Sequence, residues 1–396
     1  MIGFDEACRL VAAVATPLGA EQIALDLAWN RVLAAPVVAR RSAPEAAVSA
    51  MDGYAVREAD LASGLAHLRL VGESFAGSPK GGPPLEAGTC VRIFTGAPMP
   101  TGADRVVIQE VVRREGDAVV FPERPSPSRH VRAAGSDFAA GEVLLEPGVR
   151  LTPQALVAAA AADLNMVDVF VRPRVAVLST GDELVAPGLA APASGTIPES
   201  VSFGVAALVR AWGGEVIGQR RLRDDLPSLA RAGAAALETA DVVVVTGGAS
   251  VGERDFSKAM FEDLGLRLEF EKVAIKPGKP VWVGRVGERV VVGLPGNPSA
   301  AMVTARLFLA PILAGLGGRC PTDAWAWRMA ALESPLEACG ERECFHRGRS
   351  TVDGVRPLGN QDSSAQKDLA MADLLIRRRP AARALIAGEL VEVLAF

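Results

Sequence analysis

Polar and glycine-rich strings recur at the ends of five predicted strands between residues 173 and 318. They are residues 179–183 (STGDE), 223–225 (RDD), 246–252 (TGGASVG), 276–280 (KPGKP) and 295–298 (PGNP). Open α/β proteins bind ligands at the edge of the sheet where the carboxyl ends of the strands meet. We therefore expect the five strings to converge on one crevice.

The glycine-rich string and the lysine string both suit an anion. Backbone N–H groups of residues 246–252 could hold a phosphate at the start of a helix, although a plain strand-to-helix turn is the alternative. Lys276 and Lys279 place two ammonium groups three residues apart on a proline-stiffened turn. The chain has few lysines, so this pair favours an oxyanion site over a solvated surface.

Three carboxylates, Glu183, Asp224 and Asp255, are expected on the same rim. Hard oxygen donors beside a phosphate favour Mg²⁺. Each carboxylate taken alone could instead cap a helix or lie in a solvated turn. That alternative is the prediction for Asp225, which directly precedes a helical pattern.

Other kinds of chemistry are disfavoured. The chain has neither a GxxxxGK[ST] loop nor a GxGxxG fingerprint, and three isolated histidines make a Ser/His/Asp triad implausible. Five cysteines are an odd number without zinc-type spacing, which disfavours a disulfide scaffold, a zinc finger and a His-ligated metal site. We predict that the cysteines are small buried hydrophobes.

Net charge and hydropathy argue against further classes of protein. The net charge of −4 argues against nucleic-acid partners and against a polybasic membrane-surface protein. No apolar run reaches the roughly 18 residues of a membrane span. The first 15 residues form an amphipathic pattern without a basic start, so we expect a helix rather than a signal peptide, and by default a cytoplasmic protein.

Four regions must position these side chains, and together they predict a multidomain α/β fold. Residues 173–318 alternate buried strands with helices, which predicts a mostly parallel, doubly wound sheet. The regions around it are a helical and extended linking region (1–45 and 140–172), a β-rich module (46–139) and a small C-terminal β module (319–396). Two polar strings lie in the β-rich module, at residues 49–55 (SAMDGYA) and 92–98 (RIFTGAP). Their chemistry alone does not exclude that they are ordinary β-turns.

Taken together, the motifs resemble the molybdopterin molybdenumtransferase family, of the MoeA type and the E domain of gephyrin. The matching strings are SAMDGYAVR, RIFTGAPMPTGADRVVIQE, VAVLSTGDEL, RDD, GGASVGERDF, AIKPGKP and GLPGNP, in the family's order between residues 49 and 298.

The resemblance implies insertion of molybdenum from molybdate into adenylylated molybdopterin, with Mg²⁺ and release of AMP. It implies a linking piece, a β-rich module, a three-layer molybdopterin-binding α/β domain and a C-terminal β-barrel. It also implies a homodimer whose cleft joins the α/β domain of one subunit to the β-rich module of the other, with a molybdopterin adenylyltransferase as a candidate partner.

The family's functional positions carry over residue by residue. The catalytic set that the resemblance implies is Asp52, Thr95, Asp137, Glu183, Asp224, Asp255, Lys276 and Lys279. Within it, Glu183, Asp224 and Asp255 are the implied metal ligands. The implied substrate-binding set is Thr180, Gly181, Gly247, Gly248, Ser250, Pro295, Gly296, Asn297, Pro298 and Ser299.

Three positions depart from the family pattern. Ser136 stands for an acidic residue, Val201 for an asparagine and Ala300 for a serine. These changes keep open a second hypothesis, a non-catalytic paralogue that binds molybdopterin or finished cofactor as a carrier or as a maturation partner of a molybdoenzyme. A third and more remote hypothesis is an unrelated nucleotide-binding protein with the same kind of sheet edge. Either Arg342 or Arg347 could supply the family's C-terminal anion-binding arginine.

Overall fold

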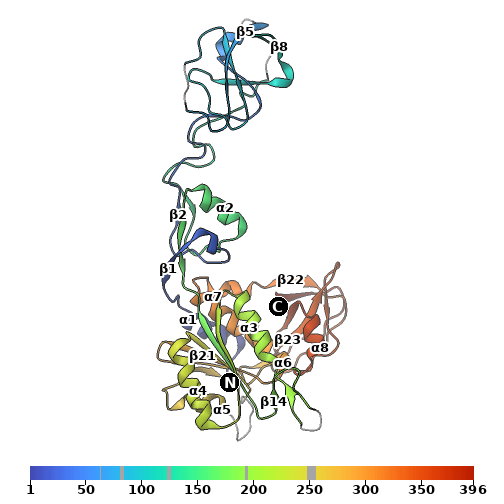
Figure 1. Cartoon of the computed structure of the whole chain (residues 1–396). Helices are drawn as coiled ribbons and strands as arrows, with labels where there is room; N and C mark the ends of the chain where they lie inside the picture. Colours follow the sequence, from blue (N-terminus) through green and yellow to red (C-terminus); the bar gives the residue numbers. More distant parts are fainter. Residues whose placement is uncertain (63, 81–83, 123–125, 192–194, 248–255) are drawn as a thin grey trace.

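The computed structural model describes residues 1–396 except 63, 81–83, 123–125, 192–194 and 248–255. The chain forms three lobes in a row (Figure 1). We call them the main lobe (α1 and β13 to β26), the connecting lobe (β1, β2, α2, β11 and β12) and the distal lobe (β4 to β9). Both termini lie in the main lobe.

A six-stranded sheet forms the centre of the main lobe. In spatial order its strands are β16 (Glu215–Leu222), β13 (Arg174–Thr180), β17 (Val242–Thr246), β21 (Arg289–Leu294), β20 (Trp282–Val286) and β18 (Arg267–Glu271). The first four are parallel, and β20 is antiparallel to both of its neighbours. Strand β18 therefore runs in the same direction as β21. The predicted doubly wound α/β fold is confirmed.

Helices cover both faces of this sheet because its strands are apolar on both sides. In β17, Val242 and Val244 join one core, whereas Val243 and Val245 join the other. This is the two-residue period of a strand buried on both faces. The helices on the first face are α3 (Val201–Ala211), α6 (Pro298–Thr304), the π-helical turn η5 (Ala305–Leu309) and α7 (Ala310–Leu316). Those on the second are α4 (Leu226–Thr239) and α5 (Phe256–Glu262).

The helical stretch Pro298–Leu316 is long and apolar enough to cross a bilayer, but 94% of its apolar window is buried inside the main lobe. Burial of this kind is typical of a core helix, so the stretch gives only weak evidence for a membrane span.

The first helix, α1 (Phe4–Val14), packs in the main lobe. Phe4 and Val11 belong to the same core as the sheet, and Asp5 pairs with the buried Arg377 at 2.7 Å. This corrects the assignment of residues 1–45 as a whole to the linking region. Helical periodicity predicted that the helix exists but could not say which core receives its apolar face.

The C-terminal region adds a second sheet to the main lobe. Its strands are β19 (Ile275–Lys276), β23 (Glu343–Ser350), β25 (Leu374–Arg378), β26 (Leu390–Ala395) and β22 (Arg328–Ala331) in spatial order, with β24 (Val355–Pro357) beside β23. Two short helices, η6 (Pro321–Trp325) and α8 (Gln366–Met371), accompany it. Strand β19 comes from the lysine string, so this string leaves the central sheet and joins the C-terminal one.

The distal and connecting lobes are smaller. The distal sheet has the order β7 (Arg105–Ile108), β4 (Gly53–Val56), β6 (Thr89–Ile93), β5 (Ala66–Ser74), β9 (Ala118–Phe121) and β8 (Arg113–Glu115), with the turns η2 (Glu58–Leu61) and η3 (Gln109–Val111). The connecting lobe pairs β1 (Ala20–Ala24) with β12 (Met166–Phe170) and β2 (Val37–Val38) with β11 (Val143–Leu145), beside η1 (Leu25–Leu27) and α2 (Pro153–Ala161).

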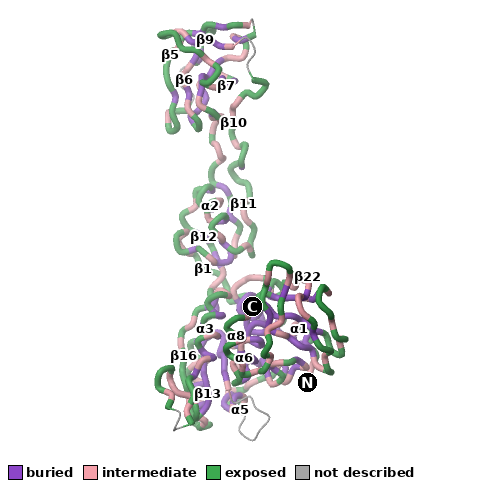
Figure 2. Tube along the Cα trace, turned by 90° about the vertical axis from the view of Figure 1, so that its right-hand side faces the viewer, coloured by how far each residue is buried: buried purple, intermediate pink, exposed green. Residues whose placement is uncertain are grey.

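Two chain segments link these lobes. They pair where β3 (Val48–Ser49) meets β10 (Val131–Arg132). Figure 2 shows this narrow, largely exposed connection between the distal and connecting lobes.

Candidate active site

The strand order reverses between β13 and β17. From β13 the chain goes through α3 to β16 on one side, and from β17 it goes through α5 to β18 on the other. Such a reversal leaves a crevice at the carboxyl ends of the two strands. Thr180 ends β13, and Gly247 directly follows β17.

A glycine is required at position 247. Its φ is +90°, and a β-carbon there would lie 2.4 Å from the carbonyl oxygen of Thr180. Any other residue would push the two strand ends apart, because neither the contact nor the backbone angle suits a side chain. Gly247 thus fixes the close approach of β13 and β17 at the crevice.

A cavity of about 620 Å³ occupies this edge, and we call it the sheet-edge cavity. Its lining takes in segments that follow β13, β16, β17, β18 and β21, as the sequence predicts. The predicted site residues that line it are Thr180, Gly181, Glu183, Asp224, Gly247, Lys279, Pro295, Gly296, Asn297 and Pro298. The strings therefore converge, and a cavity of this size is typical of a small-molecule site.

The two aspartates that follow β16 have different environments, as the sequence predicts. Asp224 lines the cavity, whereas Asp225 caps α4 by accepting a hydrogen bond from the Ser228 N–H at 3.0 Å. This bond, together with the Ser228 side chain, holds the pKa of the Asp225 carboxyl below its usual value. The predicted capping role of Asp225 is confirmed.

Further lining residues escaped the sequence reasoning. They come from the short pair β14 (Leu184–Val185) and β15 (Ile197–Pro198), from Lys272 at the end of β18, and from Ser364 and Gln366 at α8. Lys272 was missed because it fell inside the strand predicted at residues 268–275, whereas the observed strand ends at Glu271. Ser364 and Gln366 carry no local signal, because they reach the site from the C-terminal region.

Hydrogen bonds hold this C-terminal segment against the 295–298 string. The Asn297 side chain donates to the Ser363 hydroxyl at 2.8 Å, and the Ser299 hydroxyl donates to the Ala365 carbonyl at 2.7 Å. Ser299 is fully buried and is absent from the cavity lining. Its predicted substrate contact is therefore replaced by a structural one, because the hydroxyl points to the neighbouring chain segment.

Two of the three departures from the family pattern lie in the main lobe and are buried. Val201 begins α3, where the Glu199 carboxylate accepts hydrogen bonds from the Ser202 N–H at 2.8 Å and from the Ser202 hydroxyl at 2.6 Å. Ala300 is only 3% exposed. The third, Ser136, is exposed beside Asp137 in the narrow connection.

The lysine string serves two cavities. Lys279 lines the sheet-edge cavity, and with Lys276 it also lines a second cavity of about 630 Å³, which we call the C-terminal cavity. Arg342 lines the C-terminal cavity too. Arg347 is fully buried and donates to the carbonyls of Asn360 and Asp362, at 2.8 and 3.0 Å. Of the two candidate arginines, the structure therefore places Arg342 beside the lysines.

The distal residues lie apart from both cavities within one chain. The Asp52 carboxylate accepts hydrogen bonds from the N–H and the hydroxyl of Thr95, at 2.7 and 2.8 Å, and these bonds lower the pKa of Asp52. This pair belongs to the distal lobe, at the far end of the molecule from the sheet-edge cavity (Figure 1). Asp137 is exposed in the segment between β10 and β11, where its N–H donates to the Ala43 carbonyl at 3.0 Å. Gly248, Ser250 and Asp255 lie outside the described residues.

Fold and cavity define a multidomain α/β protein with a cavity lined by charged and polar residues at its sheet edge. Residues 2–162 match the family model described as the MoeA N-terminal region (domain I and II), and residues 176–315 match that of a probable molybdopterin binding domain. A molybdopterin molybdenumtransferase from Haemophilus influenzae is 39% identical over 81% of this chain and 78% of its own. Molybdopterin molybdenumtransferase 2 of Mycobacterium tuberculosis is 36% identical over 88% and 87%. The chain belongs to the molybdopterin molybdenumtransferase family, and it is a transferase of molybdenum cofactor biosynthesis.

Solved structures agree with this assignment. A molybdopterin biosynthesis MoeA protein from Pyrococcus horikoshii covers the whole of both chains with a TM-score of 0.87 and 25% identity. A second structure of such a protein from the same source has a TM-score of 0.84 and 28% identity, and covers 100% of this chain and 99% of its own.

Proposed function

We propose that the sheet-edge cavity binds adenylylated molybdopterin and molybdate, and that the chain transfers molybdenum to the pterin dithiolene with release of AMP. The observation that carries this proposal is the convergence of five strand-end segments, with Glu183, Asp224 and Lys279, on one cavity. Carboxylates and an ammonium group on one rim match a substrate that combines a metal-binding pyrophosphate with an oxyanion.

Glu183 and Asp224 would hold Mg²⁺ at this rim. The donor set fits the ion, because two carboxylates on an open rim leave coordination positions for substrate phosphates and water. A bound Mg²⁺ would neutralise charge on the pyrophosphate that is cleaved. Asp255 is part of this proposal from its place in the sequence alone.

The remaining polar groups would orient the substrates. Lys279 would donate to the arriving molybdate, and Lys272 adds a second cation to the same lining. The Thr180 hydroxyl is buried and, within the described residues, has no hydrogen-bond partner, so it can bond a substrate atom. No protein nucleophile is needed if an oxygen of molybdate or water attacks the phosphorus and AMP leaves.

We further propose a homodimer in the cytoplasm, supplied by a molybdopterin adenylyltransferase. Asp52 and Thr95 would complete the cavity of the partner subunit, because the elongated chain keeps them away from its own. Two-fold symmetry would produce two such composite sites.

The test is a single-turnover reaction of the purified protein with adenylylated molybdopterin, molybdate and Mg²⁺, in which AMP is followed by chromatography and molybdenum by elemental analysis. We expect AMP release that requires both molybdate and Mg²⁺ and that falls sharply in Asp224→Asn. The matched control is Asp263→Asn, which removes an exposed carboxylate of the main lobe that does not line the cavity.

A folded protein that binds the pterin but releases no AMP would overturn the proposal in favour of the carrier or maturation partner. Equal loss of activity in Asp263→Asn and Asp224→Asn would show that general surface charge, not the cavity, governs the reaction.

A further inference from the structure

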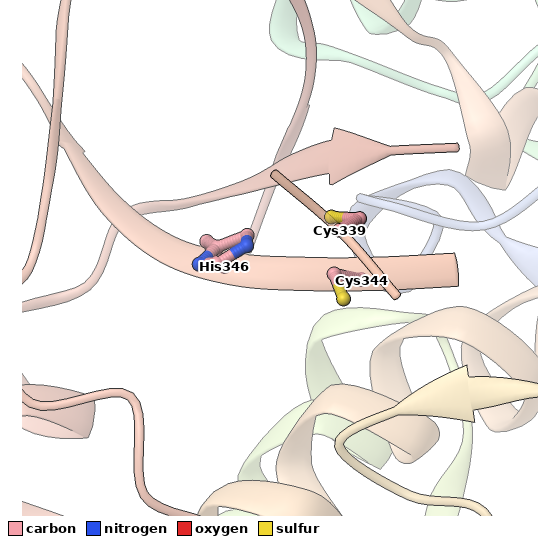
Figure 3. A group of neighbouring side chains, drawn as sticks. All are labelled: Cys339, Cys344 and His346. Atoms are coloured by element: carbon pink, nitrogen blue, oxygen red, sulfur yellow. The ribbon is translucent and has the colours of Figure 1, made fainter. Parts of the chain in front are cut away.

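The C-terminal cavity contains three side chains that the sequence analysis treated as unconnected. The nearest ligand atoms of Cys339, Cys344 and His346 all lie within 4.8 Å of one another. Figure 3 shows the three side chains together, two on β23 and one on the loop before it. The spacing C-x₄-C-x-H matches no zinc motif in sequence, and only the fold brings the group together.

Strand geometry explains how two of the three meet. Cys344 and His346 are two residues apart on β23, so their side chains emerge on the same face of the strand. Cys339 comes from the preceding loop, whose path is fixed by backbone hydrogen bonds. The Cys339 N–H donates to the Ala382 carbonyl, and the Ala381 N–H donates to the Gly340 carbonyl, each at 2.8 Å.

The ligand atoms have little else to bind. In the part of the chain that the structure describes, Nε2 of His346 is buried without a hydrogen-bond partner. Within the same described residues, the thiol of Cys344 contacts the Arg342 carbonyl at 3.5 Å and bonds the Cys339 side chain of the same group. All five cysteines are free thiols. A buried ring nitrogen without a partner calls for an explanation, and a metal ligand role is one of the few available.

Two cations lie beside the group. Lys276 is the register partner of Cys344 on β19, and both Lys276 and Arg342 line the same cavity. These cations would repel a bare divalent ion, and the negative charge of two ligating sulfurs, which lose their protons as the ion binds, would offset that repulsion.

We propose that Cys339, Cys344 and His346 bind a zinc ion whose fourth position opens into the C-terminal cavity. Two thiolates and one imidazole are a common zinc donor set, and three protein ligands leave one position for water or another small ligand. Tetrahedral Zn–S bonds place two sulfurs roughly 3.8 Å apart, so the present spacing needs only small side-chain rotations. Soft sulfur ligands also disfavour Mg²⁺ here.

The site is separate from the carboxylates proposed for Mg²⁺, and it does not depend on the proposed reaction. It would tie the loop of Cys339 to β23 beside Lys276 and Lys279. The proposal departs from the sequence-based expectation that disfavoured a His-ligated metal, because that expectation rested on spacing alone.

The test uses the full-length, reduced, metal-free protein and Co²⁺ as a spectroscopic substitute for zinc. We expect thiolate-to-cobalt absorption that saturates at one equivalent and is removed by one equivalent of Zn²⁺. Loss of a partner beyond the direct ligands costs about 10- to 100-fold in metal affinity, so loss of a direct ligand in Cys339→Ser should cost at least as much. The matched control is Cys320→Ser, which removes an exposed cysteine outside the cavity.

Cys339→Ser and His346→Gln are each compared with the control by circular dichroism, so that loss of binding is separated from loss of folding. An absence of stoichiometric cobalt absorption in the folded wild type would overturn the proposal. So would an unchanged titration in Cys339→Ser, or a Cys339–Cys344 disulfide that forms in air even with excess zinc present.

Discussion

Replacement of Gly247 by alanine tests the role of the strand reversal in building the cavity. The added methyl group would lie 2.4 Å from the Thr180 carbonyl oxygen, so the two atoms must separate by at least 0.6 Å to reach the 3.0 Å below which real contacts are essentially never seen. Overpacking of this kind costs about 1–3 kcal/mol. The backbone angle of +90° adds strain of about 1–3 kcal/mol for a residue with a side chain.

A matched control separates these two costs. Gly265 has φ +82°, and a β-carbon there meets nothing within 4 Å. Gly265→Ala therefore carries the backbone strain alone. We predict that Gly247→Ala lowers the apparent free energy of unfolding by about 1–3 kcal/mol more than Gly265→Ala does, because only Gly247→Ala adds an overlap.

Urea unfolding followed by tryptophan fluorescence measures the difference, because four of the five tryptophans pack on the two cores of the main lobe. Binding of molybdopterin should weaken in Gly247→Ala only, since the displaced Thr180 lines the cavity. Equal stability of the two variants, with pterin binding unchanged in both, would refute the assignment of this crevice.

Three further changes test single residues. Lys279→Ala should weaken molybdate binding about 10- to 100-fold in calorimetry, because a hydrogen bond from a charged group contributes about 1.5–3 kcal/mol. The control Lys367→Ala, which changes an exposed lysine, should leave the affinity for molybdate unchanged. Equal weakening in both variants would contradict the assignment of Lys279. Asp225→Ala should destabilise the main lobe by about 1 kcal/mol through loss of the α4 cap, and an unchanged melting curve would show that this cap is dispensable. Thr95→Val should raise the pKa of Asp52 in an NMR titration, because the hydroxyl donor is lost. Asp52 stabilises the fold above its unfolded pKa, and this contribution is lost as pH falls to its depressed folded pKa. In the variant the contribution should therefore be smaller and its loss complete at a higher pH, and an unchanged pKa would argue against the bond.

The convergence of the strand-end residues on one edge of the sheet was predictable, because it follows from the parallel direction of the strands. Glu183, Asp224 and Gly247 each lie one to three residues after a strand of the central sheet, and parallel strands bring such positions to one edge. The Asp225 cap was predictable for a similar reason, since a carboxylate directly before a helical pattern has a local role.

Contacts between distant segments were not predictable. The helical pattern of residues 4–14 does not say which core it enters, and nothing near Ser364 indicates that it reaches the sheet-edge cavity. The group around His346 was missed for the same reason. The loop of Cys339 is placed by backbone hydrogen bonds to residues about 40 positions later, which leave no trace in local spacing.

The most direct test of the proposed composite site is a mixture of two inactive variants, Asp52→Asn and Lys279→Ala. Each homodimer would carry a defect in both sites, whereas a mixed dimer would join the intact cavity of one chain to the intact distal lobe of the other. After random exchange of subunits we predict AMP release at roughly one quarter of the wild-type rate, since half of the dimers would have one intact site. A mixture no more active than the separate variants, with mixed dimers present, would contradict the composite site.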